Sequence, residues 1–229
     1  MLSEDLLAPR PARTLSGSSA SSATAFGPQP TVFIVDPDAS LRQSLMLLLG
    51  MRGYRTQGLA QADELVSAVR ADSRGCAIVD VRGDGSDGMH LLAKLRERDI
   101  KLPVLFVSSE ADVAAARAAL KGGAFDYLPK PFDNERLVEA VAVAVAEDRR
   151  RWEGALQSAR LRQRLARLTQ RERQVMQHVV AGLHNREIAV ELGISPRTVE
   201  VYKARMMDKL DVQRVADLVR LAVRTEAGA

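Results

Sequence analysis

Short apolar runs recur along residues 31–130 and alternate with segments that repeat leucine, valine or alanine at helical intervals. Four strong runs are largely apolar rather than alternating, and a weaker run lies over residues 54–59; the strong runs are 32–35, 77–79, 104–107 and 125–128. Continuous runs are typical of parallel strands that are buried on both faces of a sheet. The pattern predicts five strands alternating with five helices, a doubly wound α/β domain.

Helical patterning continues after this domain. A fifth helix is predicted to start near Asn134 and to lead into a mostly helical linker over residues 149–166, with Gly154 as a point where it could break. Thr169 and Glu172 then have the spacing of a capping box, in which each residue bonds the backbone of the other.

Two further helix starts follow. Asn185 is the expected N-cap of a short helix that ends before Gly193, and Ser195-Pro196 is an N-cap followed by a proline in the first turn of the next helix. Short helices joined by a glycine-containing turn are typical of a helix-turn-helix domain. We therefore predict an all-α domain over residues 167–229.

Composition narrows the setting of the protein. Hydrophobic residues make up 46% of the chain and charged residues 27%, and no apolar run approaches the roughly 18–20 residues of a membrane span. A single cysteine, Cys76, excludes a disulfide framework. No signal peptide is apparent, so we expect a cytoplasmic protein with no membrane partner. Residues 1–30 are rich in Ser, Ala and Pro and are expected to be a disordered extension, unless the start codon is misassigned.

Charge is unevenly distributed along the chain. Residues 31–148 carry 14 basic and 18 acidic side chains, whereas residues 149–229 carry 17 basic and 9 acidic, a net charge of +8. A basic second domain behind an acidic first one favours a nucleic-acid partner for the second domain. A solvated, arginine-rich helix would explain the same charges.

Polar residues stand where four of the predicted strands end. Asp36, Asp80, Ser108 and Lys130 follow or close these strands. In an open α/β sheet the carboxyl ends of the strands converge on one crevice, where ligands bind. This set of groups suits the capture of a phosphoryl group. The two carboxylates can bind Mg²⁺ and one of them can attack the phosphorus, while the hydroxyl and the ammonium can bind phosphoryl oxygens.

The segments around these residues resemble the receiver domain of two-component response regulators, over residues 31–148. The matching segments are FIVD at 33–36, IVDVR at 78–82, VS at 107–108 and YLPKPF at 127–132. The resemblance implies a flavodoxin-like five-stranded parallel sheet in the order 2-1-3-4-5. It also implies a cis bond between Lys130 and Pro131.

The resemblance further assigns roles to individual residues. Asp80 would be the phosphoacceptor, with Ser108, Tyr127 and Lys130 as the switch and phosphoryl-binding residues. Mg²⁺ would be held by Asp36, Asp80 and the backbone carbonyl of Arg82. A sensor histidine kinase would donate the phosphoryl group, and the chain would then form a homodimer through its fourth helix, fifth strand and fifth helix.

Two departures from the receiver pattern affect this expectation. Pro37 occupies a position where receivers carry a second acidic residue, and Asp38 is a candidate replacement ligand. The loop after Asp80 contains Gly83 and Gly85 in place of the usual Met-Pro region. A degenerate receiver that regulates without phosphorylation is therefore an alternative. A remote one is a phosphatase of the haloacid dehalogenase type, since residues 36–38 read Asp-Pro-Asp, although Ala-Ser follows where Gly-Thr is expected.

The C-terminal domain resembles a LuxR-type helix-turn-helix, and the whole chain resembles FixJ/NarL-type response regulators. The matching segments are LTQRER at 168–173, VAGLHNREIA at 180–189, LGISPRTVEVY at 192–202 and KL at 209–210. This resemblance implies a transcriptional regulator, not an enzyme. Double-stranded promoter DNA would be its target, and RNA polymerase a further partner.

Within the expected recognition helix, Val199, Met206 and Leu210 share one face, which should pack against the rest of the domain. By resemblance, the residues directed at base edges are Glu200, Val201, Ala204 and Arg205. Those placed for DNA phosphates are Arg197, Thr198, Lys203 and Lys209. Phosphate contacts supply affinity and register, whereas base contacts determine sequence preference. A solvated helix face is the alternative for any one of these residues.

Overall fold

The computed structural model describes residues 29–83, 85–110 and 113–226, so the extension predicted for residues 1–30 lies almost wholly outside the described residues. Contacts divide the chain into two compact units, with the boundary between Val145 and Ala146. Within the described ranges, no helix has the length and apolar character needed to cross a bilayer.

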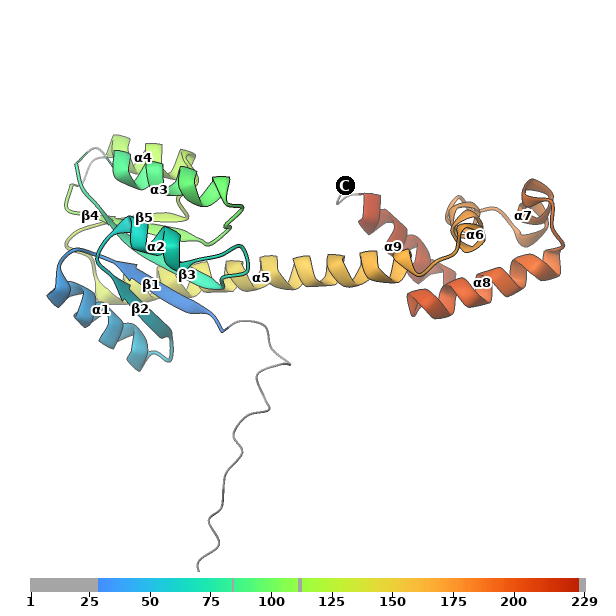
Figure 1. Ribbon diagram of the computed structural model, residues 1–229, viewed down its shortest axis with the longest axis horizontal. Coiled ribbons are helices and arrows are strands. Elements are labelled where there is room, and N and C mark those ends of the chain that lie inside the picture. The colour runs from blue at the N-terminus through green and yellow to red at the C-terminus, as the bar shows by residue number, and fades with distance from the viewer. Residues whose placement is uncertain (1–28, 84, 111–112, 227–229) are drawn as a thin grey trace, which may run out of the picture. The chain divides into compact units, whose positions relative to one another are not determined.

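A five-stranded parallel sheet forms the centre of the first unit (Figure 1). Its strands are β1 (Thr31–Val35), β2 (Arg55–Leu59), β3 (Gly75–Val81), β4 (Val104–Ser108) and β5 (Asp126–Pro129). The order is β2-β1-β3-β4-β5, which confirms the predicted doubly wound fold. The weak apolar pattern of β2 is explained by its place at the edge of the sheet, where only Leu59 is buried.

Helices cover both faces of this sheet. One layer contains α2 (Ala62–Ala68), α3 (Ser86–Glu97) and α4 (Val113–Lys121), and the other contains α1 (Ala39–Met51) and the first part of α5 (Asn134–Ala166). Successive strand residues point to opposite faces, so Phe33 joins the first layer and Ile34 the second. Because both faces are covered, the inner strands are apolar over most of their length, with polar residues near their ends.

The predicted linker is part of α5, which is one unbroken helix of 33 residues. The break considered at Gly154 is absent. A single glycine inside a helix costs only about 1 kcal/mol relative to alanine, so it weakens the helix without ending it. A Cβ added at Gly154 would meet no atom within 4 Å, which means that packing does not require a glycine there.

The second unit is helical, with α6 (Gln170–Val180), α7 (Asn185–Leu192), α8 (Pro196–Leu210) and α9 (Val215–Glu226). Thr169 and Glu172 form the predicted capping box, and Ser195 caps α8 ahead of Pro196. The N-cap of α7 is His184 rather than Asn185, because the Glu187 carboxylate accepts the His184 backbone N–H at 2.6 Å. Val199, Met206 and Leu210 are fully buried, as their spacing predicted.

Candidate functional site

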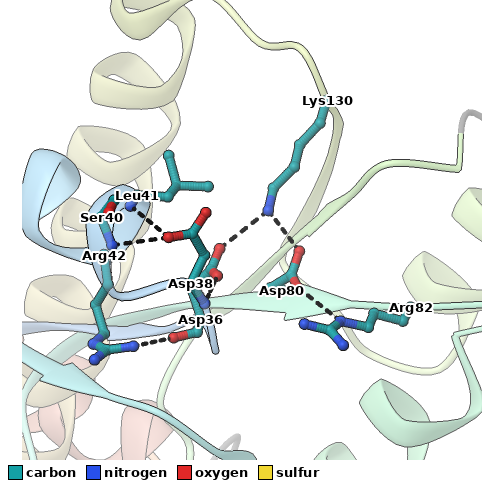
Figure 2. A network of polar contacts seen from close by, with 8 residues as sticks. All are labelled: Asp36, Asp38, Ser40, Leu41, Arg42, Asp80, Arg82 and Lys130. Carbon is teal, nitrogen blue, oxygen red and sulfur yellow. Dashed lines mark hydrogen bonds and ion pairs between the residues drawn. The ribbon is translucent and has the colours of Figure 1, made fainter.

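Two carboxylates and one ammonium meet at the carboxyl end of the sheet (Figure 2). Lys130 Nζ lies 2.6 Å from Asp80 Oδ1 and 3.0 Å from Asp36 Oδ2. All three side chains are shielded, with exposed fractions of 18% for Lys130, 8% for Asp80 and 3% for Asp36. The structure therefore brings together residues that are up to 94 positions apart in the sequence.

The parallel strands explain this convergence. Asp36 directly follows β1, Asp80 is the penultimate residue of β3, and Lys130 directly follows β5. The strands pair in parallel with Val35 opposite Val79, and their carboxyl ends reach the same edge of the sheet. The backbone of Lys130 is tied to β4, because its N–H donates to Ser108 O at 2.6 Å.

The charges at this site stabilise one another. Burial of the Lys130 ammonium lowers its pKa, but hydrogen bonds and charge attraction from Asp80 and Asp36 outweigh burial and leave the pKa above its ordinary value. Lys130 is thus a fixed positive charge at neutral pH, held between two acidic groups. A site of this kind attracts anions to the ammonium and cations to the carboxylates.

Arg82 and Asp38 differ in their relation to the two central carboxylates. Arg82 Nε lies 3.6 Å from Asp80 Oδ2, although 72% of the Arg82 side chain is exposed. Asp38 instead caps α1, where its Oδ1 accepts the N–H groups of Ser40 and Leu41 at 2.8 and 3.3 Å. Because Pro37 has no carboxylate and Asp38 is used as a cap, Asp36 and Asp80 are the carboxylates that meet at Lys130.

Ser108 and Tyr127 are linked through the backbone of Glu110. Ser108 is the last residue of β4, is 1% exposed, and accepts the Glu110 N–H on its Oγ at 3.1 Å. The Tyr127 hydroxyl donates to the Glu110 carbonyl at 2.9 Å. The two predicted switch residues therefore both bind the loop after β4 at Glu110, Ser108 from the end of β4 and Tyr127 from β5.

A cleft of about 360 Å³ opens over these groups. Its lining combines the predicted receiver residues other than Tyr127 with the start of α1 and the loop after β4; these residues are Asp36, Asp38, Leu41, Asp80, Val81, Arg82, Ser108, Ser109, Glu110 and Lys130. In the part of the chain that the structure describes, no three acidic, histidine or cysteine side chains are clustered as metal ligands. The cleft thus offers two converging carboxylates and an ammonium. The backbone carbonyl of Arg82, the third predicted metal ligand, accepts the Gly85 N–H at 3.3 Å.

The second unit contains a helix-turn-helix formed by α7, the turn over residues 193–195, and α8. Gly193 ends α7 in a left-handed conformation, with φ of 64°. Ser195 Oγ accepts the Thr198 N–H at 3.0 Å and caps α8. The turn therefore begins at the C-cap of α7 and ends at the N-cap of α8. Helices joined in this way can place the second helix in the major groove of DNA.

The predicted base-facing residues form the exposed side of α8. Glu200, Val201, Ala204 and Arg205 are all exposed. Of the predicted phosphate contacts, Arg197 is exposed and pairs with Glu200 at 3.1 Å, and Lys203 is half-buried. Thr198 is half-buried at the start of α8, where its Oγ1 lies 2.8 Å from Ser195 Oγ.

Lys209 faces inward instead. Its Nζ donates to both carboxylate oxygens of Glu172, at 2.8 and 2.7 Å, and Glu172 is 2% exposed. Burial raises the pKa of Glu172, but hydrogen bonds from Lys209 and Thr169 outweigh it and hold the pKa below its ordinary value. A phosphate contact by Lys209 stays a prediction, and its ammonium already has a buried carboxylate partner.

Sequence patterns did not indicate two residues that shape the cleft. The Arg42 guanidinium, from the first turn of α1, bonds the backbone carbonyl of Asp36 and so fixes the loop after β1. Glu110 supplies backbone groups to Ser108 and Tyr127. The only signal was proximity, since Arg42 follows the Asp38 cap by one helical turn and Glu110 follows Ser108 by two residues.

Comparison with known proteins identifies both units. Residues 32–142 match the family described as response regulator receiver domain. Residues 166–222 match the family described as bacterial regulatory proteins, luxR family.

Whole-chain relatives share this organisation. Transcriptional regulatory protein FixJ of Bradyrhizobium diazoefficiens is 39% identical over 195 residues, covering 84% of this chain and 94% of that protein. Transcriptional regulatory protein TdiR of Thauera aromatica is 37% identical over 202 residues, covering 88% and 89%. The structure of response regulator StyR has a TM-score of 0.79 at 34% identity and covers 86% of this chain and 100% of that one. The chain therefore belongs to the response regulators of two-component systems in which a receiver domain precedes a LuxR-type DNA-binding domain, as in the FixJ transcriptional regulators.

Proposed function

We propose that phosphorylation of Asp80 controls the binding of promoter DNA by α8. The observation that carries this proposal is the convergence of Asp36, Asp80 and Lys130 at 2.6–3.0 Å in a cleft that also contains Ser108. One Asp80 carboxylate oxygen attacks the phosphorus of a donor phosphoryl group, and the bond from phosphorus to the donor breaks. The proposed physiological donor is a phosphorylated sensor histidine kinase.

The neighbouring side chains bind and orient the transferred group. The Lys130 ammonium now contacts the Asp80 carboxylate. It is therefore close enough to contact the negatively charged oxygens of a phosphoryl group on Asp80. Ser108 can turn its hydroxyl toward a phosphoryl oxygen, which would release the Glu110 N–H that it now accepts. Because Tyr127 is bonded to the carbonyl of the same residue, the loop and the tyrosine are expected to move together.

The residues present fit a magnesium ion with few protein ligands. Mg²⁺ is commonly held by one or two carboxylates together with water and phosphate oxygens. Asp36, Asp80 and the backbone carbonyl of Arg82 would hold it here. When bound, the ion supplies positive charge beside the phosphoryl oxygens. Pro37 removes a carboxylate and Lys130 competes for the other two, so we expect weak affinity.

The two alternatives have less support. A regulator independent of phosphorylation is not favoured, because Asp36, Asp80, Ser108 and Lys130 all line one cleft. A phosphatase would need Asp38 as a free acid or base, but this carboxylate accepts two backbone N–H groups at the start of α1. We therefore propose a regulator without enzymatic turnover of its own.

Intact-mass measurement after incubation with acetyl phosphate and Mg²⁺ tests the receiver half of the proposal. Wild type should gain the mass of one phosphoryl group, and Asp80→Asn should gain none. Asp72→Asn, a change at an exposed aspartate outside the cleft, is the matched control and should behave as wild type. Equal labelling of Asp80→Asn and wild type would contradict the assignment of the phosphoacceptor.

DNA binding is proposed to occur as a homodimer on two half-sites, in the cytoplasm, with RNA polymerase as the downstream partner. The net charge of +8 over residues 149–229 supports an anionic partner for this unit. Selection of duplexes from a randomised pool by the full chain tests this part of the proposal. Recovery of no enriched sequence at low ionic strength would overturn it.

A further inference from the structure

The last turn of α5 is bonded to the end of α8. Arg164 Nη1 donates to the Leu210 carbonyl at 3.1 Å, and Arg164 Nη2 donates to Asp211 Oδ2 at 3.0 Å. All three residues belong to the second unit. Leu165, the next residue of α5, packs against the hydrophobic core that contains Leu210.

Arginine is well suited to this position. The last carbonyl groups of a helix have no donor within the helix, and the carboxyl end carries partial negative charge. A guanidinium meets both needs and can hold two acceptors at once because its donors lie in a planar fork. Lysine has one ammonium on a flexible stem and cannot reproduce this geometry.

The backbone conformation of Asp211 is a second, independent observation in favour of a functional role for this contact. It follows α8 in the left-handed conformation, with φ of 55°. The two preceding helices end with glycine in that conformation, at Gly182 (φ 87°) and Gly193 (φ 64°). Glycine adopts this backbone without strain, whereas other residues do so at a cost. An aspartate at the end of α8 accepts that cost and provides the carboxylate that Arg164 binds.

The elements joined by this contact have different roles. α8 carries the exposed side chains proposed to read bases, and α5 begins in the receiver core, where Leu137 and Val141 are fully buried. We propose that Arg164 is a positioning residue for DNA recognition, which fixes the carboxyl end of α8 to the interdomain helix through Leu210 and Asp211. This inference rests on the proposed function, because it assumes that α8 reads DNA.

The test measures the affinity of the full chain, treated with phosphodonor, for a duplex that the wild-type chain selects from a randomised pool. Arg164→Ala and Asp211→Gly should each weaken binding roughly tenfold, since the first removes both hydrogen bonds of the guanidinium and the second removes the one to the Asp211 carboxylate. Arg164→Lys should not restore affinity. Asp211→Gly removes a negative charge, which by electrostatics alone would strengthen DNA binding.

Two further measurements separate positioning from loss of stability and from loss of a phosphate contact. Asp211→Gly should not lower the midpoint of thermal unfolding, because glycine fits the left-handed backbone. The slope of log affinity against log salt should be the same for Arg164→Ala and wild type, whereas loss of a phosphate contact would reduce it by about 0.9. Arg162→Ala, an exposed arginine two residues earlier, is the matched control and should retain wild-type affinity.

Wild-type affinity in Asp211→Gly, or an equal loss in Arg162→Ala, would overturn the inference. Failure of the proposed function is a different result, in which the wild-type chain itself enriches no duplex. Amide hydrogen exchange at residues 210–212 then decides the structural half of the inference. Faster exchange in Arg164→Ala would support the hold on α8, and unchanged exchange would refute it.

Discussion

At the scale of single residues, Lys130 balances the negative charge of the two carboxylates in the receiver cleft. It is the cation that both Asp36 and Asp80 contact most closely, at 3.0 and 2.6 Å. Without a cation these two shielded carboxylates would repel each other, and Asp36 Oδ2 and Asp80 Oδ1 would lose their donor, although Asp36 Oδ1 would keep the Asp38 N–H at 2.8 Å. A metal ion held by Asp36 and Asp80, as proposed, would therefore compete with the Lys130 ammonium for the same oxygens.

This competition makes a prediction for Lys130→Met. Without metal, the variant should be less stable than wild type by about 1–3 kcal/mol, because two buried acceptors lose their donor. Its affinity for Mg²⁺ should be at least about tenfold tighter, since one positive charge is removed beside the site. Saturating Mg²⁺ should then recover the lost stability.

Titration of Mg²⁺ followed by thermal unfolding measures both effects, with the exposed Lys121→Met as the control for charge. Equal Mg²⁺ affinity in the two lysine variants would refute the competition.

A second prediction at this scale concerns the buried Glu172. At pH 7, Glu172→Gln should lower the stability of the second unit by about 1–3 kcal/mol, because the Lys209 pair is lost. The pKa of Glu172 lies below its ordinary value of 4.5, so its stabilising effect is present above about pH 4.5 and is lost as pH falls through the folded-state pKa. The difference between wild type and variant should therefore shrink in acid.

Urea unfolding at pH 7 and in steps below pH 4.5 measures the difference in stability between wild type and Glu172→Gln. Amide exchange in α6 and α8 shows whether that difference lies in the second unit. Glu191→Gln, at an exposed glutamate on α7, should show no comparable effect at either end of the range. A difference that stays constant down to the acid limit would show that the Glu172 charge is not the source of the stability.

Residue types and strand ends were enough to predict which groups would gather in the cleft. Asp36, Asp80 and Lys130 could be found because parallel strands bring their carboxyl ends to one edge. The direction of individual side chains could not be predicted in the same way. Asp38 is held by backbone donors of its own helix, and Lys209 by a carboxylate 37 residues earlier in the chain. The first contact depends on where the helix begins and the second on how α6 and α8 pack, and residue spacing contains neither.

At the scale of elements, three helical glycines distinguish propensity from packing. Gly154 and Gly50 have open space where a Cβ would be, whereas a Cβ at Gly88 would lie 2.8 Å from side-chain atoms of Phe106 and Val81. Alanine is the better helix former, so Gly154→Ala and Gly50→Ala should each stabilise their helix by about 0.5–1 kcal/mol. Gly88→Ala should destabilise the receiver by about 1–3 kcal/mol through overpacking.

Thermal unfolding measures the signs of these three changes, and amide exchange across residues 150–158 locates the effect of Gly154→Ala. Slower exchange confined to that segment is the expected result. Faster exchange there would mean that glycine has a structural role in α5 that the open space around it does not suggest.

Elements were predicted well where helix ends carry their own chemistry. The Thr169 capping box and the Ser195 cap were evident from the sequence, because the bonds they form are local. The cap at His184 was displaced by one residue, since Glu187 supplies the reciprocal bond and histidine is an unusual N-cap. The continuity of α5 through Gly154 could not be decided by pattern, because a single glycine is compatible with a helix or with its end.

At the scale of the whole molecule, one chain presents one recognition helix. α8 has 15 residues, and at 1.5 Å per residue it is about 22 Å long, which is shorter than one turn of DNA. Four side chains proposed to face bases on such a helix could specify only a half-site. If α8 reads promoter DNA as proposed, high affinity would therefore require a second copy whose α8 reaches the major groove one turn further on, about 34 Å away.

This requirement predicts how phosphorylation should change DNA binding. If phosphorylation of Asp80 joins two chains, the second binding event becomes intramolecular, and phosphodonor-treated wild type should prefer a duplex with two half-sites over one with a single half-site by on the order of 100-fold. Asp80→Asn should show the same preference before and after treatment. Changing the half-site spacing by half a helical turn should abolish the preference, because the second α8 would then face the wrong side of the duplex. Titration of the two duplexes at fixed salt measures the preference, and a gain on phosphorylation that is equal for single and double half-sites would mean that the receiver acts on each chain separately.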